Sequence, residues 1–89
     1  MPLNFPNQSR YFDAERGAVR FWGYDGAFEV SCSIDWEALQ VLVPGMELNE
    51  TDSAAAFDKV RTRVCSVADR AYSRAPKGTL AIEIFANDL

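Results

Sequence analysis

The sequence has no histidine and only two cysteines among its 89 residues. Without histidine, histidine-dependent catalytic triads and zinc sites with imidazole ligands are excluded. Cys32 and Cys65 lie far apart and form no Cys-x-x-Cys motif, so we expect two reduced, buried thiols rather than a disulfide or a redox pair. No apolar run approaches the roughly 20 residues of a membrane span, and residues 1–10 lack the pattern of a signal peptide. These features predict a cytoplasmic protein.

The composition is that of an ordinary globular protein. Hydrophobic residues make up 48% and charged residues 25% of the chain. The length suits one domain over residues 1–89 with a single modest core, and there is no internal repeat or low-complexity segment.

The strongest structural signal is Asp25-Gly26, which separates the alternating runs VRFWGY and AFEVSCSI. Asp-Gly in this setting predicts a β-hairpin over residues 19–34 with these two residues as its loop. In that register Trp22 faces Glu29, and Gly23 faces Phe28 and makes room for its ring. Because side chains alternate between faces, we expect one core face formed by Val19, Phe21, Gly23, Phe28, Val30, Cys32 and Ile34. The opposite face then carries Arg20, Trp22, Tyr24, Ala27, Glu29, Ser31 and Ser33.

The segments before and after this hairpin complete the sheet. Residues 1–8, which include Pro2 and Pro6, are expected to be irregular, with Leu3 and Phe5 at the edge of the domain. A strand is expected over 8–13 and a turn over 14–17. A last strand is expected over 79–85, with an aliphatic core side made of Leu80, Ile82 and Ile84.

Two helices are predicted between the hairpin and the last strand. Asp35 is expected to cap a short helix over 36–42, and Pro44-Gly45 ends it. A longer helix is expected over 52–74, with Asn49, Thr51 or Asp52 as cap and Thr51 preferred. Its apolar stripe at helical spacing consists of Phe57, Val60, Val64, Ala68 and Ala71.

The order β-β-β-α-α-β predicts an α+β fold with two layers. It is a four-stranded, mostly antiparallel sheet with both helices on one face. The sequence leaves open whether the last strand pairs with the first or with the third strand.

Several stretches of the chain resemble a known family. They are Asn4-Phe5-Pro6-Asn7, the run from Val19 to Asp25, Phe57-Asp58 with Arg61, and Ala71-Tyr72-Ser73-Arg74. Together they are similar to a small bacterial family known as domain of unknown function 1488, and the run Val-Arg-Phe-Trp-Gly-Tyr is the most specific part. The resemblance implies a compact α+β fold and brings no activity, substrate or catalytic residue.

The sheet face opposite the helices is the first candidate for function. Exposed apolar patches often mark contact sites, and Trp, Tyr and Arg are enriched at binding hot spots. The expected interaction face consists of Arg20, Trp22, Tyr24, Glu29, Glu83 and Phe85. Two alternatives are ordinary sheet surface and coverage of this face by residues 1–8.

The long helix carries the second candidate. Residues 59–77 hold six of the nine Lys and Arg residues and one acid, a net charge of +5. Four of these bases share one stripe, which is Lys59, Arg63, Arg70 and Arg74. The stripe could meet an anion, a nucleic acid or an acidic partner, although outer helix faces are normally charged and the whole chain has a net charge of −4.

A third candidate is a small-ligand pocket whose edge is formed by Asp58, Arg61 and Tyr72, with a packing role for Arg61 as the alternative. No residue spacing demands catalysis, and carboxylates such as Glu29 and Glu83 on an open face usually stay solvated. We therefore expect a non-enzyme without cofactor or metal. It acts by protein contact through the Trp22 face, as a homodimer or accessory subunit. Nucleic-acid or anion binding is the alternative, and no membrane contact is expected.

Overall fold

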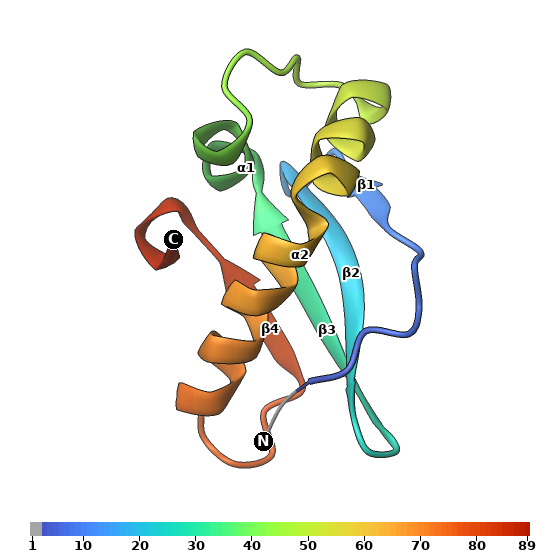
Figure 1. The fold of residues 1–89 in the computed structure, drawn as a ribbon, viewed down its shortest axis with the longest axis vertical. Coiled ribbons are helices and arrows are strands. Elements are labelled where there is room, and N and C mark those ends of the chain that lie inside the picture. The colour runs from blue at the N-terminus through green and yellow to red at the C-terminus, as the bar shows by residue number, and fades with distance from the viewer. Residues whose placement is uncertain (1–2) are drawn as a thin grey trace.

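The structure, a computed structural model, describes residues 3–89 as a sheet layer and a helix layer (Figure 1). Residues 1 and 2, and with them the expectation for Pro2, lie outside the described residues. The strands are β1 (Tyr11–Asp13), β2 (Ala18–Asp25), β3 (Phe28–Asp35) and β4 (Ala81–Ile84), so β1 and β4 are shorter than expected. The helices are α1 (Trp36–Leu42) and α2 (Glu50–Arg74), and a 3₁₀ turn (Ala86–Asp88) follows β4.

The strand order is β1-β2-β3-β4, which resolves the open question about the last strand. β4 pairs with the third strand, β3, and the pairing is parallel. Parallel neighbours need a long crossover connection, and α1 and α2 supply it. The other two pairings are antiparallel, so the predicted α+β fold with a mostly antiparallel sheet is confirmed.

The hairpin turns one residue later than predicted. Asp25 pairs with Phe28, and the loop is Gly26-Ala27. A two-residue loop on Asp25-Gly26 would need positive φ at both positions, whereas among the described residues only glycines have positive φ, with Gly26 at 61°. A loop that begins with glycine needs it only there. The pairings shift by two residues, so each side chain keeps its predicted face and Trp22 lies opposite Ser31 instead of Glu29.

The core lies between one sheet face and both helices. It includes Val19, Phe21, Val30, Cys32 and Ile34 from the hairpin, as predicted, together with Ile82 and Ile84 from β4. The same cluster holds Ala38 and Leu39 of α1 and Phe57, Val64 and Ala68 of α2, so both helices pack on this face.

Two residues predicted for the core are exposed. The exposed fraction is 68% for Phe28 and 54% for Leu80. Both line one hollow together with Asp25 and the C-terminal end of α2, and the hairpin turn extends past α2 (Figure 1). The assignment of these side chains to the core was therefore wrong, because alternation gives a face but not the extent of the helix that covers it.

Gly23 makes room for Phe5 and not for Phe28. A Cβ atom at Gly23 would lie 2.8 Å from Cε1 of Phe5, whose ring packs beside Phe21 with centroids 6.1 Å apart. Asn4 exchanges two backbone hydrogen bonds with Tyr24, of 2.7 and 2.8 Å. The buried Leu3 donates its N–H to Asp69 on α2. The segment that starts at Leu3 is thus held at the edge of β2 on the helix side.

The caps explain where both helices begin. The Asp35 carboxylate accepts the Ala38 N–H at 2.8 Å, which confirms the predicted cap of α1. For α2 the cap is Asn49, which accepts the Asp52 N–H at 2.8 Å, so the preference for Thr51 was wrong. Asn49 was among the three candidates, and it places the helix start at Glu50.

Helix α2 is kinked at Val60, where φ is −115° and ψ is 19°. A single helical wheel therefore fails to describe the whole helix. Val60 and Ala71 of the predicted apolar stripe are only half-buried, whereas Val67, outside that stripe, is buried.

Candidate functional site

The sheet face opposite the helices is uncovered by any helix of the described chain (Figure 1). Leu3 and Phe5 pack on the helix side and do not cover the aromatic face, whereas the Asn7 side chain lies near the Tyr24 hydroxyl. Trp22 and Tyr24 on β2 are half-buried, while Phe85 after β4 is 48% exposed.

Two rows of paired residues cross this face. In the first, Tyr11 of β1 lies beside Arg20, then Ser33, then Glu83 of β4. In the second, Trp22 lies beside Ser31, which lies beside Ala81. Because Ser31, Ser33 and Ala81 have small side chains, the middle of the face is shallow, and the large side chains lie at its flanks.

Polar contacts fix the orientation of several side chains on this face. The Arg20 guanidinium donates to the Ser31 hydroxyl at 3.0 Å, and the Tyr24 hydroxyl donates to the Glu29 carboxylate at 2.9 Å. The hydrogen bond to Glu29, followed by partial burial and the Glu29 charge, raises the pKa of Tyr24. Tyr24 therefore stays a neutral hydrogen-bond donor at neutral pH.

Tyr11 is the member of this face that the sequence interpretation missed. It pairs with Arg20 and is 56% exposed. A signal was present, because Tyr11 precedes Phe12, which packs against Trp36 on the core side with ring centroids 5.4 Å apart. Alternation along the strand places Tyr11 on the opposite face.

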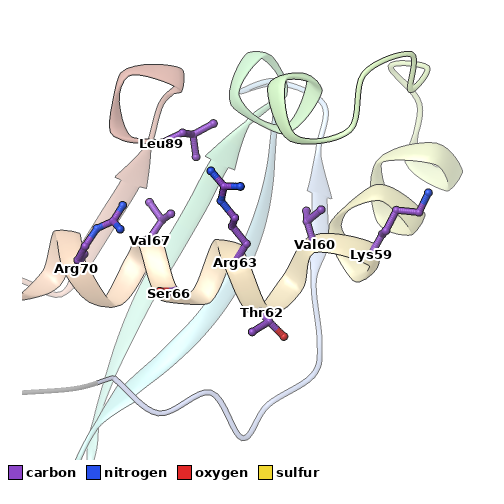
Figure 2. A pocket seen from close by; sticks show the side chains of 8 residues that line it. All are labelled: Lys59, Val60, Thr62, Arg63, Ser66, Val67, Arg70 and Leu89. Carbon is purple, nitrogen blue, oxygen red and sulfur yellow. The ribbon is translucent and has the colours of Figure 1, made fainter.

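The four bases of the predicted stripe lie along α2, beside two adjoining hollows. Lys59, Arg63 and Arg70 line a hollow of about 660 Å³ together with Val60, Val67 and Leu89 (Figure 2). Arg70 and Arg74 line a second hollow of about 540 Å³, which shares Val67 and Leu89 with the first. We call the two hollows together the α2 groove.

The structure does not bring the three residues of the expected small-ligand pocket to one place. Asp58 and Arg61 lie together beside Gln8 and Arg10, in a shallow hollow that does not include Tyr72. Arg61 donates to the Gln8 carbonyl at 2.9 Å and to the Asp58 carboxylate at 3.2 Å, and its guanidinium lies 4.8 Å from the centroid of the Phe57 ring. These contacts tie the segment before β1 to α2.

The Asp58 carboxylate accepts hydrogen bonds from both neighbouring arginines, Arg10 and Arg61. Arg10 donates to its second oxygen at 2.9 Å. Partial burial by itself raises the pKa of Asp58, but the hydrogen bonds and charges of Arg10 and Arg61 outweigh it and lower the pKa below its ordinary value. The carboxylate is therefore a fixed anion that joins two cations, which suits a packing role better than acid–base chemistry.

Tyr72 lines a different hollow, of about 460 Å³, at the hairpin end of the sheet. Its hydroxyl donates to the Asp25 carboxylate at 2.5 Å, and this hydrogen bond, followed by burial and the Asp25 charge, raises the pKa of Tyr72. The exposed side chains of Phe28 and Leu80 line the same hollow. The two misassigned core residues thus meet at one partly open apolar site.

Cys32 and Cys65 are both free, with Cys32 buried and Cys65 half-buried. Burial, with a smaller contribution from Cys65, raises the pKa of Cys32 to about 12, and burial likewise raises the pKa of Cys65. Both thiols are therefore protonated and poorly nucleophilic at neutral pH.

The raised pKa of Cys32 predicts a loss of stability in mild alkali. An unfolded thiol ionises near pH 8.5, whereas Cys32 holds its proton in the folded state, so the stabilising effect is complete below pH 8.5 and declines as the pH rises toward 12. Between pH 9 and 10, the free energy of unfolding of the wild type, measured by urea unfolding, should fall by up to about 1.4 kcal/mol more per pH unit than that of Cys32→Ala. Equal slopes for the two proteins would contradict the prediction.

Within residues 3–89, no group of three His, Cys, Asp or Glu side chains is placed to hold a metal ion. No helix in the same part of the chain combines the length and apolar character needed to cross a membrane.

Comparisons with known proteins give a family but no activity. The family model described as "Protein of unknown function (DUF1488)" matches residues 3–82. A crystal structure of a protein of unknown function from the same family, from Shewanella loihica, is similar with a TM-score of 0.76 over 93% of each chain. Its sequence identity of 17% supports a shared fold and nothing more. No curated protein matches the chain. Because the family model covers most of the sequence, the chain belongs to the DUF1488 family of proteins of unknown function.

Proposed function

We propose that the protein is a non-catalytic interaction module that pairs with a second copy of itself through the open face of its sheet. The observation that supports this is an uncovered face with large aromatic side chains, among them Tyr11 at 56% and Phe85 at 48% exposure. A patch of this kind is uncommon on a monomer and often marks a contact site. Two-fold pairing of identical surfaces is the commonest form of oligomer.

The arrangement of the two rows favours a second copy as the partner. Consider two such faces packed together about a two-fold axis that runs along β3 through Ser31 and Ser33. Arg20 lies one strand to one side of Ser33 and Glu83 one strand to the other, so each Arg20 falls opposite the Glu83 of the other copy. In the next row the large Trp22 falls opposite the small Ala81. The face is therefore complementary to itself in charge and in size, as a two-fold interface requires.

The proposal includes the absence of catalysis and a location in the cytoplasm. Its support is the lack of histidine in the sequence and two unpaired thiols that burial keeps protonated. Unpaired cysteines fit a reducing compartment.

The test is the solution mass of the wild type and of Trp22→Glu, measured by light scattering across a range of concentrations. We expect a dimer for the wild type and a monomer for the variant, because the substitution places a carboxylate inside the interface, opposite the apolar Ala81 of the other copy.

A matched control is Phe28→Glu, which makes the same kind of change on the same hairpin but on the helix side, where Phe28 is 68% exposed. This control should remain dimeric. A wild type that stays monomeric at the highest concentration would refute pairing with a second copy, and equal dissociation of both variants would refute the assignment to this face.

A further inference from the structure

The α2 groove is lined by cations that lack partners. Among residues 3–89, Arg10, Arg16 and Arg61 each form an ion pair with an aspartate. Lys59, Arg63, Arg70 and Arg74 make no ion pair or side-chain hydrogen bond in the described part of the chain. The one acidic side chain in the lining, Asp88, accepts the Phe85 N–H at 2.8 Å and, among the residues described, forms no ion pair with these cations. The side chains that line the groove therefore carry four positive charges and one negative charge, spread along α2, in a protein whose net charge is −4.

Between these cations the floor of the groove has an apolar strip, formed by the half-buried Val60 and Leu89 and the small exposed part of Val67, beside the exposed Thr62 and Ser66. Figure 2 shows Arg63 and Arg70 on either side of Val67, all directed toward the 3₁₀ turn and the neighbouring Leu89. Val60 continues this floor toward Lys59, and Ala71 and Ala75 continue it toward Arg74. A ligand that fits such a lining has apolar groups along its centre and negative charge along its sides.

The length of the groove favours an extended ligand over a small one. From Lys59 to Arg74 the helix rises about 22 Å at 1.5 Å per residue. The cations are spread along this length and are exposed, so they do not converge on a single small anion.

A nucleic acid fits the lining less well than a protein segment. Single-stranded nucleic acid is usually held by aromatic side chains that stack on the bases, and none of the residues that line the groove is aromatic. The net negative charge of the protein also opposes approach of a polyanion at long range.

We infer that the α2 groove is the docking site for an acidic, amphipathic segment of a partner protein. The segment lies along α2 with apolar side chains on the half-buried Val60, Ala71 and Leu89 and carboxylates against the four cations, in the manner of a helix bound in a groove. Guanidinium groups suit this role because they bind carboxylates through two parallel hydrogen bonds. The groove belongs to the helix layer, so the inference is independent of the proposed pairing through the sheet.

The test uses a fluorescent 18-residue peptide, of roughly five turns, with leucines at helical spacing and glutamates on both flanks. Binding to the full chain is followed by fluorescence anisotropy at moderate salt. We expect saturable binding of this peptide and at least a tenfold weaker affinity in the double variant Arg63→Glu/Arg70→Glu. A peptide with serine in place of leucine should also bind at least tenfold more weakly, because it cannot cover the apolar floor.

The matched control is Arg16→Glu/Lys77→Glu, which changes the net charge equally at two exposed bases outside the groove. Its affinity should stay within twofold of the wild type. Equal weakening of both double variants would overturn the inference, because net charge alone would explain it, and so would failure of the glutamate–leucine peptide to bind.

Two further probes separate the other ligand classes. Duplex DNA that binds more tightly than the peptide, with a salt slope of about −3.6 for four phosphate contacts and with loss of binding in Arg63→Glu/Arg70→Glu, would replace the inference with a nucleic-acid interface. Inorganic phosphate that displaces the peptide at low millimolar concentration would point to a small-anion site and would equally overturn it. Measuring the peptide on Trp22→Glu shows whether docking survives when pairing through the sheet is lost, as we expect.

Discussion

Replacing Phe57 with alanine is expected to lower the free energy of unfolding by about 3–5 kcal/mol. The Phe57 side chain is fully buried where α2 meets the sheet, and its ring lies 5.1 Å from that of Phe21. The Arg61 guanidinium lies 4.8 Å from the centroid of the Phe57 ring and would lose its apolar support. A domain of this size has about 5–15 kcal/mol of stability in total, so the variant should be only marginally folded.

Urea unfolding followed by tryptophan fluorescence measures this change, and Phe28→Ala is its control. Phe28 is 68% exposed, so its truncation should cost less than about 1 kcal/mol. The comparison tests whether a side chain that alternation assigns to the core face, such as Phe28, contributes to stability when α2 does not cover it. A large loss in Phe28→Ala, or a small one in Phe57→Ala, would contradict the packing described above.

The difference between these two phenylalanines shows which features of the fold can be predicted from the sequence. Alternation assigns both faces of the hairpin correctly because a strand has a period of two residues, and the two-residue error in pairing leaves every face unchanged. The turn itself was misassigned, because Asp-Gly is compatible with more than one loop and the choice depends on the φ angles available to Asp25 and Ala27.

What the sequence could not give is the extent of the cover over the sheet. The exposure of Phe28 and Leu80 depends on where α2 crosses the sheet, which no local pattern records. The kink at Val60 has no proline or glycine that would predict it, and Val67, which the predicted apolar stripe left out, is buried. These are tertiary effects that override local periodicity.

The candidate surfaces also include some features that the sequence predicts and others that depend on the tertiary fold. The faces of Trp22 and Tyr24 and the line of bases on α2 follow from periodicity alone. The α2 groove does not, because its second wall includes Leu89, which approaches Val67 only through the fold. The expected pocket at Asp58, Arg61 and Tyr72 used wheel positions, and the structure shows two separate hollows instead.

A charge exchange gives the sharpest test of pairing through the open sheet face. In the proposed pairing, Arg20 of one copy lies opposite Glu83 of the other, and symmetry produces this contact twice. Arg20→Glu alone, or Glu83→Arg alone, places like charges opposite each other at both contacts. We expect each single variant to raise the dissociation constant of the dimer on the order of 100-fold, about 2.7 kcal/mol.

The double variant Arg20→Glu/Glu83→Arg should restore the affinity to within about tenfold of the wild type, since it re-forms two opposite-charge contacts with the direction reversed. Sedimentation equilibrium on the four proteins measures all the constants. Restoration is specific to the proposed axis, because a dimer that merely needed Arg20 for its hydrogen bond to Ser31 would not recover when Glu83 is also changed. If each single variant weakens the dimer and the double variant is weaker still, the two residues do not face each other, and the two-fold axis along β3 is wrong even though the face is used.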